Sequence, residues 1–206
     1  MSETKANSRL EAFCDGVFAI ALTLLIIDIK IPSTLEINTN ADFWFALKHI
    51  APSIYAFILS FGIILITWVN HHHTLKLVDK SSPPFIYANG FLLLTVVFVP
   101  FPTALLGQYI FTNHSAPAVV IYSLVYAFQA IGWNLISHTA LKSGHLLTKN
   151  EKSTIRMRGV QKNSYFAFTV YSICTIAAFW FPLSVARIIS LLWIFWLIYG
   201  INLKDV

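Results

Sequence analysis

Long runs of apolar residues alternate along this chain with short polar segments. A membrane hydrocarbon core of about 30 Å takes about 20 helical residues to cross, and six runs reach or approach that length. They predict membrane helices at about residues 10–31, 43–69, 85–106, 117–140, 163–181 and 184–203. Because the runs are continuous, they favour helices over barrel strands, whose apolar positions alternate. The pattern predicts an all-α integral membrane protein in which residues 1–206 form one six-helix transmembrane domain.

The first apolar run has two different faces. At about 100° per residue, a helix places its bulkiest residues on one narrow apolar stripe. The stripe contains Phe13, Gly16, Ile20, Leu24, Ile27 and Ile31. Thr23 lies at its edge and Asp15 lies roughly opposite. A carboxylate beside such a run is costly in a membrane unless it has a polar partner, so we expect Asp15 to point into the bundle.

The distribution of charge predicts the orientation in the membrane. Only 11% of the residues are charged and 57% are hydrophobic, a composition outside that of soluble globular domains. Of the 14 Lys and Arg residues, 11 lie at the two ends of the chain or in the second and fourth connections. Lys and Arg concentrate on the cytoplasmic side of membrane proteins. We therefore expect a multi-pass protein of the cell membrane with both termini in the cytoplasm, and the net charge of +5 does not indicate nucleic-acid binding.

Motifs for catalysis, cofactors and conventional ion selectivity are missing from the sequence. It contains no Gly-rich phosphate-binding loop, no HExxH or CxxC metal or redox motif and no TVGYG-like filter segment. Its third to sixth apolar runs hold almost no ionisable residue, which argues against proton-coupled transport. Cys14 and Cys174 both lie in apolar runs, so no disulfide is expected. The sequence thus predicts neither an enzyme nor a cofactor.

Two polar clusters remain as candidate sites. Arg9, Phe13, Asp15 and Gly16 form an RxxxFxDG pattern at the start of the first helix. The second apolar run ends in Trp68-Val69-Asn70-His71-His72-His73, on the same side of the membrane by the predicted topology. Our hypothesis is that Asp15, Arg9 and the segment 70–73 form a polar network that pins the first helix to the second.

The three consecutive histidines also allow a metal site to be considered. Imidazole is a common ligand of zinc and related metals. Neighbouring residues on a helix point about 100° apart, so His71, His72 and His73 cannot all reach one ion. Geometry therefore favours hydrogen-bonding histidines, and no metal is expected.

The apolar stripe has two interpretations. Apolar residues at this spacing usually pack against other helices or contact lipid. The alternative is a pore whose hydrophobic constriction gates by excluding water. Composition alone does not choose between them.

The segment RLEAFCDGVFAIALTLLIIDIKIP, together with WVNHHH, resembles the prokaryotic members of the transmembrane protein 175 family, relatives of the endosomal and lysosomal potassium channel. The six-helix layout extends this resemblance over essentially the whole chain. The family signature is RxxxFSDG. Arg9, Phe13, Asp15 and Gly16 match it, while Cys14 stands where serine is usual, and a thiol hydrogen-bonds more weakly than a hydroxyl.

The resemblance implies a homotetrameric cation channel without a selectivity-filter loop. By this similarity, the first helix of each subunit lines a central pore that conducts K⁺ with moderate selectivity over other monovalent cations. Ile20, Leu24 and Ile27 form the narrowest points, Thr23 tunes selectivity beside them, and the motif residues attach the first helix to its neighbours.

Three other functions stay open at this point. A secondary transporter or exporter of a small solute needs polar groups near mid-membrane, and the sequence offers only Gln129, Asn134, Tyr126 and Thr169, which we expect to form interhelical hydrogen bonds. A metal-dependent membrane enzyme needs a metal at His71–His73. A purely structural membrane subunit shows no ion flux.

Overall fold

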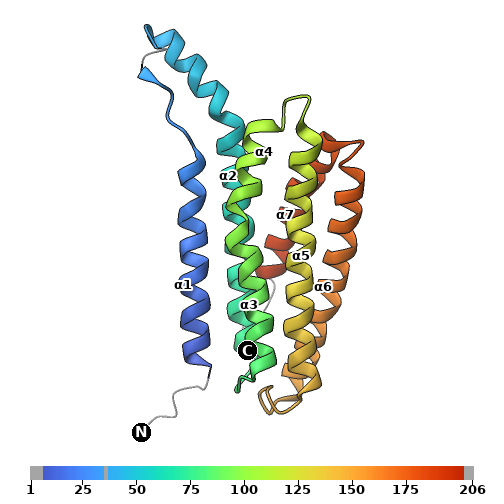
Figure 1. The fold of residues 1–206 in the computed structure, drawn as a ribbon. Helices are drawn as coiled ribbons and strands as arrows, with labels where there is room; N and C mark the ends of the chain where they lie inside the picture. The colour runs from blue at the N-terminus through green and yellow to red at the C-terminus, as the bar shows by residue number, and fades with distance from the viewer. Residues whose placement is uncertain (1–6, 35–36, 202–206) are drawn as a thin grey trace.

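The computed structural model describes residues 7–34 and 37–201. This part of the chain is helical throughout, apart from its connections and one isolated bridge between Val78 and Leu147 (Figure 1). Across residues 7–34 and 37–201, six helical segments follow one another, of which the first ends in a short 3₁₀ helix and the third is divided in two. The elements are α1 (Ser8–Leu24), η1 (Leu25–Asp28), α2 (Asn40–Leu75), α3 (Pro83–Phe98), α4 (Pro100–Tyr109), α5 (Ser115–Lys142), α6 (Glu151–Ala177) and α7 (Pro182–Ile201).

Several helix ends differ from the predicted ones by three residues or more. The first helix stops at Asp28 rather than at residue 31. The second continues to Leu75, so the histidine run lies inside the helix. The fifth begins at Glu151, where the Asn150 side chain accepts a hydrogen bond from the backbone N–H of Lys152 and caps the helix. The end predicted for the sixth helix lies outside the described residues.

The division between α3 and α4 has a simple cause. Pro100 and Pro102 have no backbone N–H, so they cannot donate to the carbonyls one turn earlier. At the break, the Val99 N–H donates to the carbonyl of Val96, three residues earlier, at 3.1 Å. Pro52, by contrast, lies inside α2, which continues past it without interruption.

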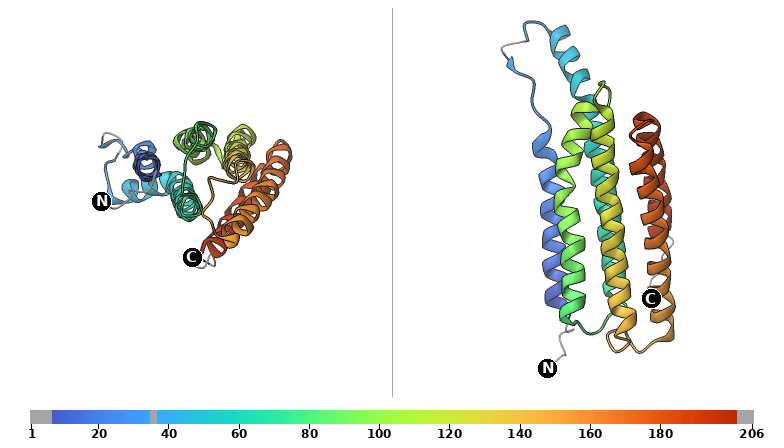
Figure 2. Two further views of the ribbon diagram at one scale, coloured as in Figure 1. Left: turned by 90° about the horizontal axis from the view of Figure 1, so that it is seen from below. Right: turned by 45° about the vertical axis from the view of Figure 1, so that its right-hand side comes forward.

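The helices run antiparallel, and α1 stands at one edge of the bundle (Figure 2). It packs mainly against α2 and α3, while α6 and α7 lie at the opposite side and contact α5. The start of α1, the α2–α3 connection and the α5–α6 connection all lie at one end of the bundle (Figure 1). Most of the basic residues of the described chain are therefore at this end.

Within the described residues, four segments are long and apolar enough to cross a membrane: Ser8–Asp28, Asn40–Leu75, Pro83–Tyr109 and Ser115–Lys142. The described apolar part of α7, Pro182–Ile198, is shorter. The first twelve residues of α6 include Lys152, Arg156, Arg158 and Lys162. The all-α membrane fold with six helical segments is confirmed, and membrane crossing by α6 and α7 stays a prediction.

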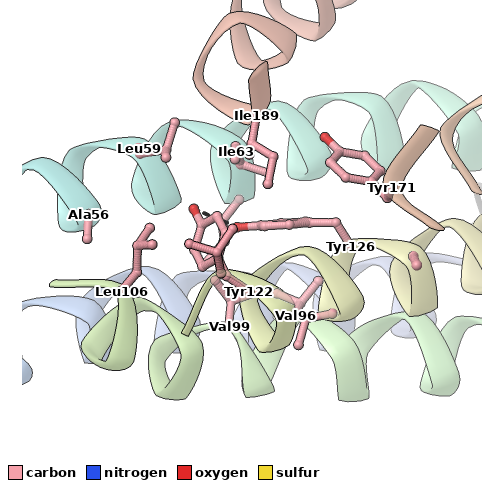
Figure 3. Close-up of a cluster of buried hydrophobic side chains, with 14 of the residues drawn as sticks. Ala56, Leu59, Ile63, Val96, Val99, Leu106, Tyr122, Tyr126, Tyr171 and Ile189 are labelled. Carbon is pink, nitrogen blue, oxygen red and sulfur yellow. Dashed lines mark hydrogen bonds between the residues drawn. The ribbon is translucent and has the colours of Figure 1, made fainter. Parts of the chain in front are cut away.

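A chain of hydroxyl groups runs through the core where α2, α4 and α5 meet. Thr103 Oγ1 donates to Ser60 Oγ at 2.7 Å, Ser60 lies 2.9 Å from Tyr122 Oη, and Tyr126 Oη donates to Tyr122 Oη at 3.2 Å. Figure 3 shows both tyrosines among buried aliphatic side chains such as Ile63 and Val96. Such hydrogen bonds hold membrane helices together where lipid removes most of the hydrophobic drive between them.

Candidate functional site

One face of α1 and η1 is packed into the bundle. Cys14, Phe18, Ala21 and Leu25 are at most 1% exposed and belong to the main hydrophobic core. Their spacing of four, three and four residues places them on one side of the helix. This side contacts α2 and α3, so it fixes the rotation of α1 against the rest of the chain.

The opposite face is exposed, and it carries the apolar stripe predicted from the sequence. Ile20 is 58% exposed, Leu24 36% and Ile27 70%. A Cβ atom added at Gly16 meets no heavy atom within 4 Å. Phe13 and Ile31 are also exposed, so the stripe is without a covering element over the described part of the chain. Five bulky apolar side chains along this face can therefore contact lipid or another protein.

Thr23 lies at the edge of this stripe and is exposed. Its hydroxyl donates to the backbone carbonyl of Ile20 at 2.8 Å, within its own helix. The hydroxyl oxygen keeps lone pairs that can face a polar or charged ligand.

Polar contacts join α1 to α2 at the basic end of the bundle. Trp68 Nε1 donates a hydrogen bond to Asp15 Oδ1 at 2.8 Å, which supplies the partner that this carboxylate needs. One turn further along, His72 Nδ1 lies 3.1 Å from Glu11 Oε1. The Trp68 and His72 rings stack with their centroids 6.2 Å apart. Asp15 thus points into the bundle and away from the stripe, as expected.

The consecutive histidines point to different partners, as their helical spacing predicts. His71 is 1% exposed, and its Nε2 lies 2.8 Å from Asn89 Oδ1 of α3. Its ring also lies against Phe18 of α1, with centroids 5.4 Å apart. Across residues 7–34 and 37–201 there is no cluster of three or more His, Cys, Asp or Glu side chains that could hold a metal ion.

Within the described chain, two residues predicted to belong to the polar network between the first two helices make no side-chain contact in it. Arg9 is exposed and makes no polar contact with the described residues. The buried Asn70 Oδ1 has no hydrogen-bond partner there either. Sequence reasoning missed Glu11 and Asn89, which do make the contacts. Two features of the sequence could have indicated them: Glu11 is acidic and lies one turn before Asp15, and Asn89 is an amide in an otherwise apolar helix.

Comparison with known proteins identifies the family. Residues 9–100 match the profile described as the endosomal/lysosomal potassium channel TMEM175. A potassium channel from Chamaesiphon minutus is 41% identical over 147 residues, which cover 71% of this chain and 72% of that relative. The chain belongs to the TMEM175 family. A second TMEM175 relative, a potassium channel from Streptomyces collinus, is 40% identical over 146 residues, or 68% of this chain and 67% of the relative.

The TMEM175 fold extends over nearly the whole chain. The crystal structure of a lysosomal potassium-selective channel TMEM175 homologue from Chamaesiphon minutus superposes with a TM-score of 0.83 at 32% identity. The match covers 94% of this chain and 97% of that one. The resemblance inferred from the RxxxFxDG and WVNHHH segments is confirmed at the level of the family. The roles of the individual residues stay predictions.

Proposed function

We propose that four copies of this chain surround a shared axis in the cell membrane, and that their α1 helices line a pore for K⁺. Membership of a family of ion channels supports conduction rather than catalysis. The observation that carries the proposal is the contrast within α1. One apolar face is packed into the subunit, and the other, with Ile20, Leu24 and Ile27, is left exposed at the edge of the bundle.

Rings of these three residues form the constriction. Alkyl groups offer an ion no replacement for its water shell, so a narrow apolar ring excludes both water and ions when closed. A small outward or rotational movement of α1 widens the rings and lets water enter. K⁺ holds its water less tightly than Na⁺ and so loses less at an apolar neck, which gives moderate selectivity. Thr23, one residue before Leu24, supplies the nearest polar oxygen.

The contacts at the basic end hold α1 in register during this movement. Trp68 to Asp15 and His72 to Glu11 attach the start of α1 to α2. The basic residues at that end support a cytoplasmic position for it and for both termini. The constriction then lies toward the outer half of the membrane.

Replacing stripe residues by asparagine tests the proposal. We expect Ile27→Asn and Ile20→Asn to raise the current several-fold and to bring K⁺/Na⁺ permeability closer to equal, because a polar ring stays hydrated. The measurement is single-channel recording in planar bilayers with K⁺ on one side and Na⁺ on the other.

Ile26→Asn is the matched control, since Ile26 is 52% exposed but lies off the stripe. Its currents should equal those of the unsubstituted protein. Unchanged currents in both stripe variants would show that the stripe does not line the pore.

A further inference from the structure

A cavity of about 100 Å³ lies between α2, α5, α6 and α7, apart from the α1 stripe. Its walls are mostly apolar and aromatic. Tyr126, Trp133, Tyr171 and Trp196 line it, and Figure 3 shows Tyr126 and Tyr171 near each other in the core. None of the lining residues is an Asp, Glu, Lys, Arg or His. A ligand held here is therefore uncharged.

Two buried amide atoms are left without partners at this cavity. Gln129 is 6% exposed and its Nε2 donor has no partner in the described structure. The Asn70 Oδ1 acceptor is likewise buried and unpaired with any described residue. The nearby hydroxyls differ, because Thr67 and Thr74 donate to carbonyls of their own helix, at 2.8 Å each. Among the described lining residues, the fully buried side-chain atoms without a partner are thus one donor and one acceptor.

Buried polar atoms without a partner are costly and are rare in native proteins. A hydroxyl group supplies both missing functions, because its oxygen accepts and its hydrogen donates. The cavity exceeds the space of one water, about 30 Å³ in the liquid, and aromatic walls favour a partner with an apolar body.

We propose that this cavity binds a small neutral amphiphile of the alcohol class. Its hydroxyl accepts a hydrogen bond from Gln129 Nε2 and donates one to Asn70 Oδ1. Its hydrocarbon part lies among Tyr126, Trp133 and Trp196. The ligand reaches the cavity by dissolving in the surrounding bilayer.

The position of the cavity lets a bound ligand affect ion conduction, an inference that rests on the proposed function. The Trp133 ring is 6.1 Å from the His71 ring, which in turn contacts Phe18 of α1. Asn70 is next to His71 in α2. An occupant therefore presses on the part of α2 that holds α1, and we expect it to change the open fraction of the channel.

Photolabelling tests the binding directly. The protein in lipid nanodiscs is irradiated with a diazirine-bearing hexanol, and labelled residues are located by mass spectrometry. We expect saturable labelling of cavity-lining residues that excess 1-hexanol suppresses at least fivefold. Labelling only of lipid-facing residues, or labelling that 1-hexanol does not reduce, overturns the proposal.

Two variants sharpen the test. Gln129→Leu removes the donor at nearly constant volume and should lower cavity labelling by about three- to tenfold, the worth of one hydrogen bond. Gln108→Leu makes the same change at an exposed position of α4 and should leave it unchanged. Equal labelling in both variants contradicts the assigned role of Gln129. If Gln129→Leu does not fold, the competition experiment on the unsubstituted protein decides.

Binding and conduction are read separately. In bilayers, 1-hexanol should change the K⁺ current of the unsubstituted protein and of Gln108→Leu, but much less that of Gln129→Leu. Cavity labelling without any ion current refutes the pore and leaves the binding site intact. Normal currents without cavity labelling refute the binding site and leave the pore intact.

Discussion

The two faces of α1 have similar hydrophobicity and similar spacing, yet opposite surroundings. Cys14, Phe18 and Ala21 are buried at intervals of four and three residues, and Ile20, Leu24 and Ile27 are exposed at the same intervals. The buried face includes the small residues Cys14 and Ala21, which let α2 and α3 approach closely, whereas Ile20, Leu24 and Ile27 on the exposed face are all bulky. Lipid is as apolar as the protein core, so hydrophobicity does not distinguish a packed helix face from an exposed one. In a membrane protein, the size of the side chains and the helices they pack against make this distinction.

The largest stability difference should separate Phe18 from Ile20. Phe18→Ala leaves a void among buried side chains and should cost on the order of 2–3 kcal/mol, mainly through lost packing because lipid replaces water as the alternative environment. Ile20→Ala should cost less than about 0.5 kcal/mol, since exposed positions change stability little. Unfolding of the detergent-solubilised protein, followed by circular dichroism, measures both. Equal losses would mean that the stripe is packed as tightly as the core.

A smaller effect is expected at the contact between α1 and α2. Trp68→Phe removes the donor to Asp15 and leaves a half-buried carboxylate without that partner, at a cost of about 1–2 kcal/mol. Trp44→Phe is the matched control, because Trp44 is 67% exposed. Thermal stability in detergent should fall for Trp68→Phe only. A similar loss in both variants would assign the effect to the indole ring rather than to its hydrogen bond.

The smallest effect is expected for the ion pair between Glu11 and His72. Both side chains are about one-third exposed, so water screens the pair and its loss should cost at most about 1 kcal/mol. Glu11→Gln should lower stability slightly at low salt and not at all in molar salt. Glu151→Gln, at an exposed helix start, serves as the control. A loss that persists at high salt would point to packing instead of charge.

The sequence was informative where a residue type has few alternatives. Periodicity located the stripe, and the cost of a carboxylate in lipid predicted that Asp15 needs a partner. It could not show which apolar face of α1 is packed, because both satisfy the same periodicity.

Contacts between residues far apart in the sequence could not be predicted either. Nothing local to His71 reveals that Asn89, eighteen residues away on α3, is its partner. Gln129 and Asn134 were expected to form interhelical hydrogen bonds, but each has an unpaired buried atom within the described structure. The cavity between α2, α5, α6 and α7 arises from how four helices meet, which no single segment encodes.

The central claim is that the stripe of α1 faces a shared axis, and block by Cd²⁺ tests it most directly. Ile27→Cys and Ile26→Cys are each made in a background carrying Cys14→Ser and Cys174→Ala, and K⁺ currents are recorded in bilayers. Four thiolates around one axis bind a soft cation tightly, so Cd²⁺ should block Ile27→Cys until a chelator is added and should leave Ile26→Cys conducting. Block of Ile26→Cys with continued conduction by Ile27→Cys would place the pore on another face and contradict the account.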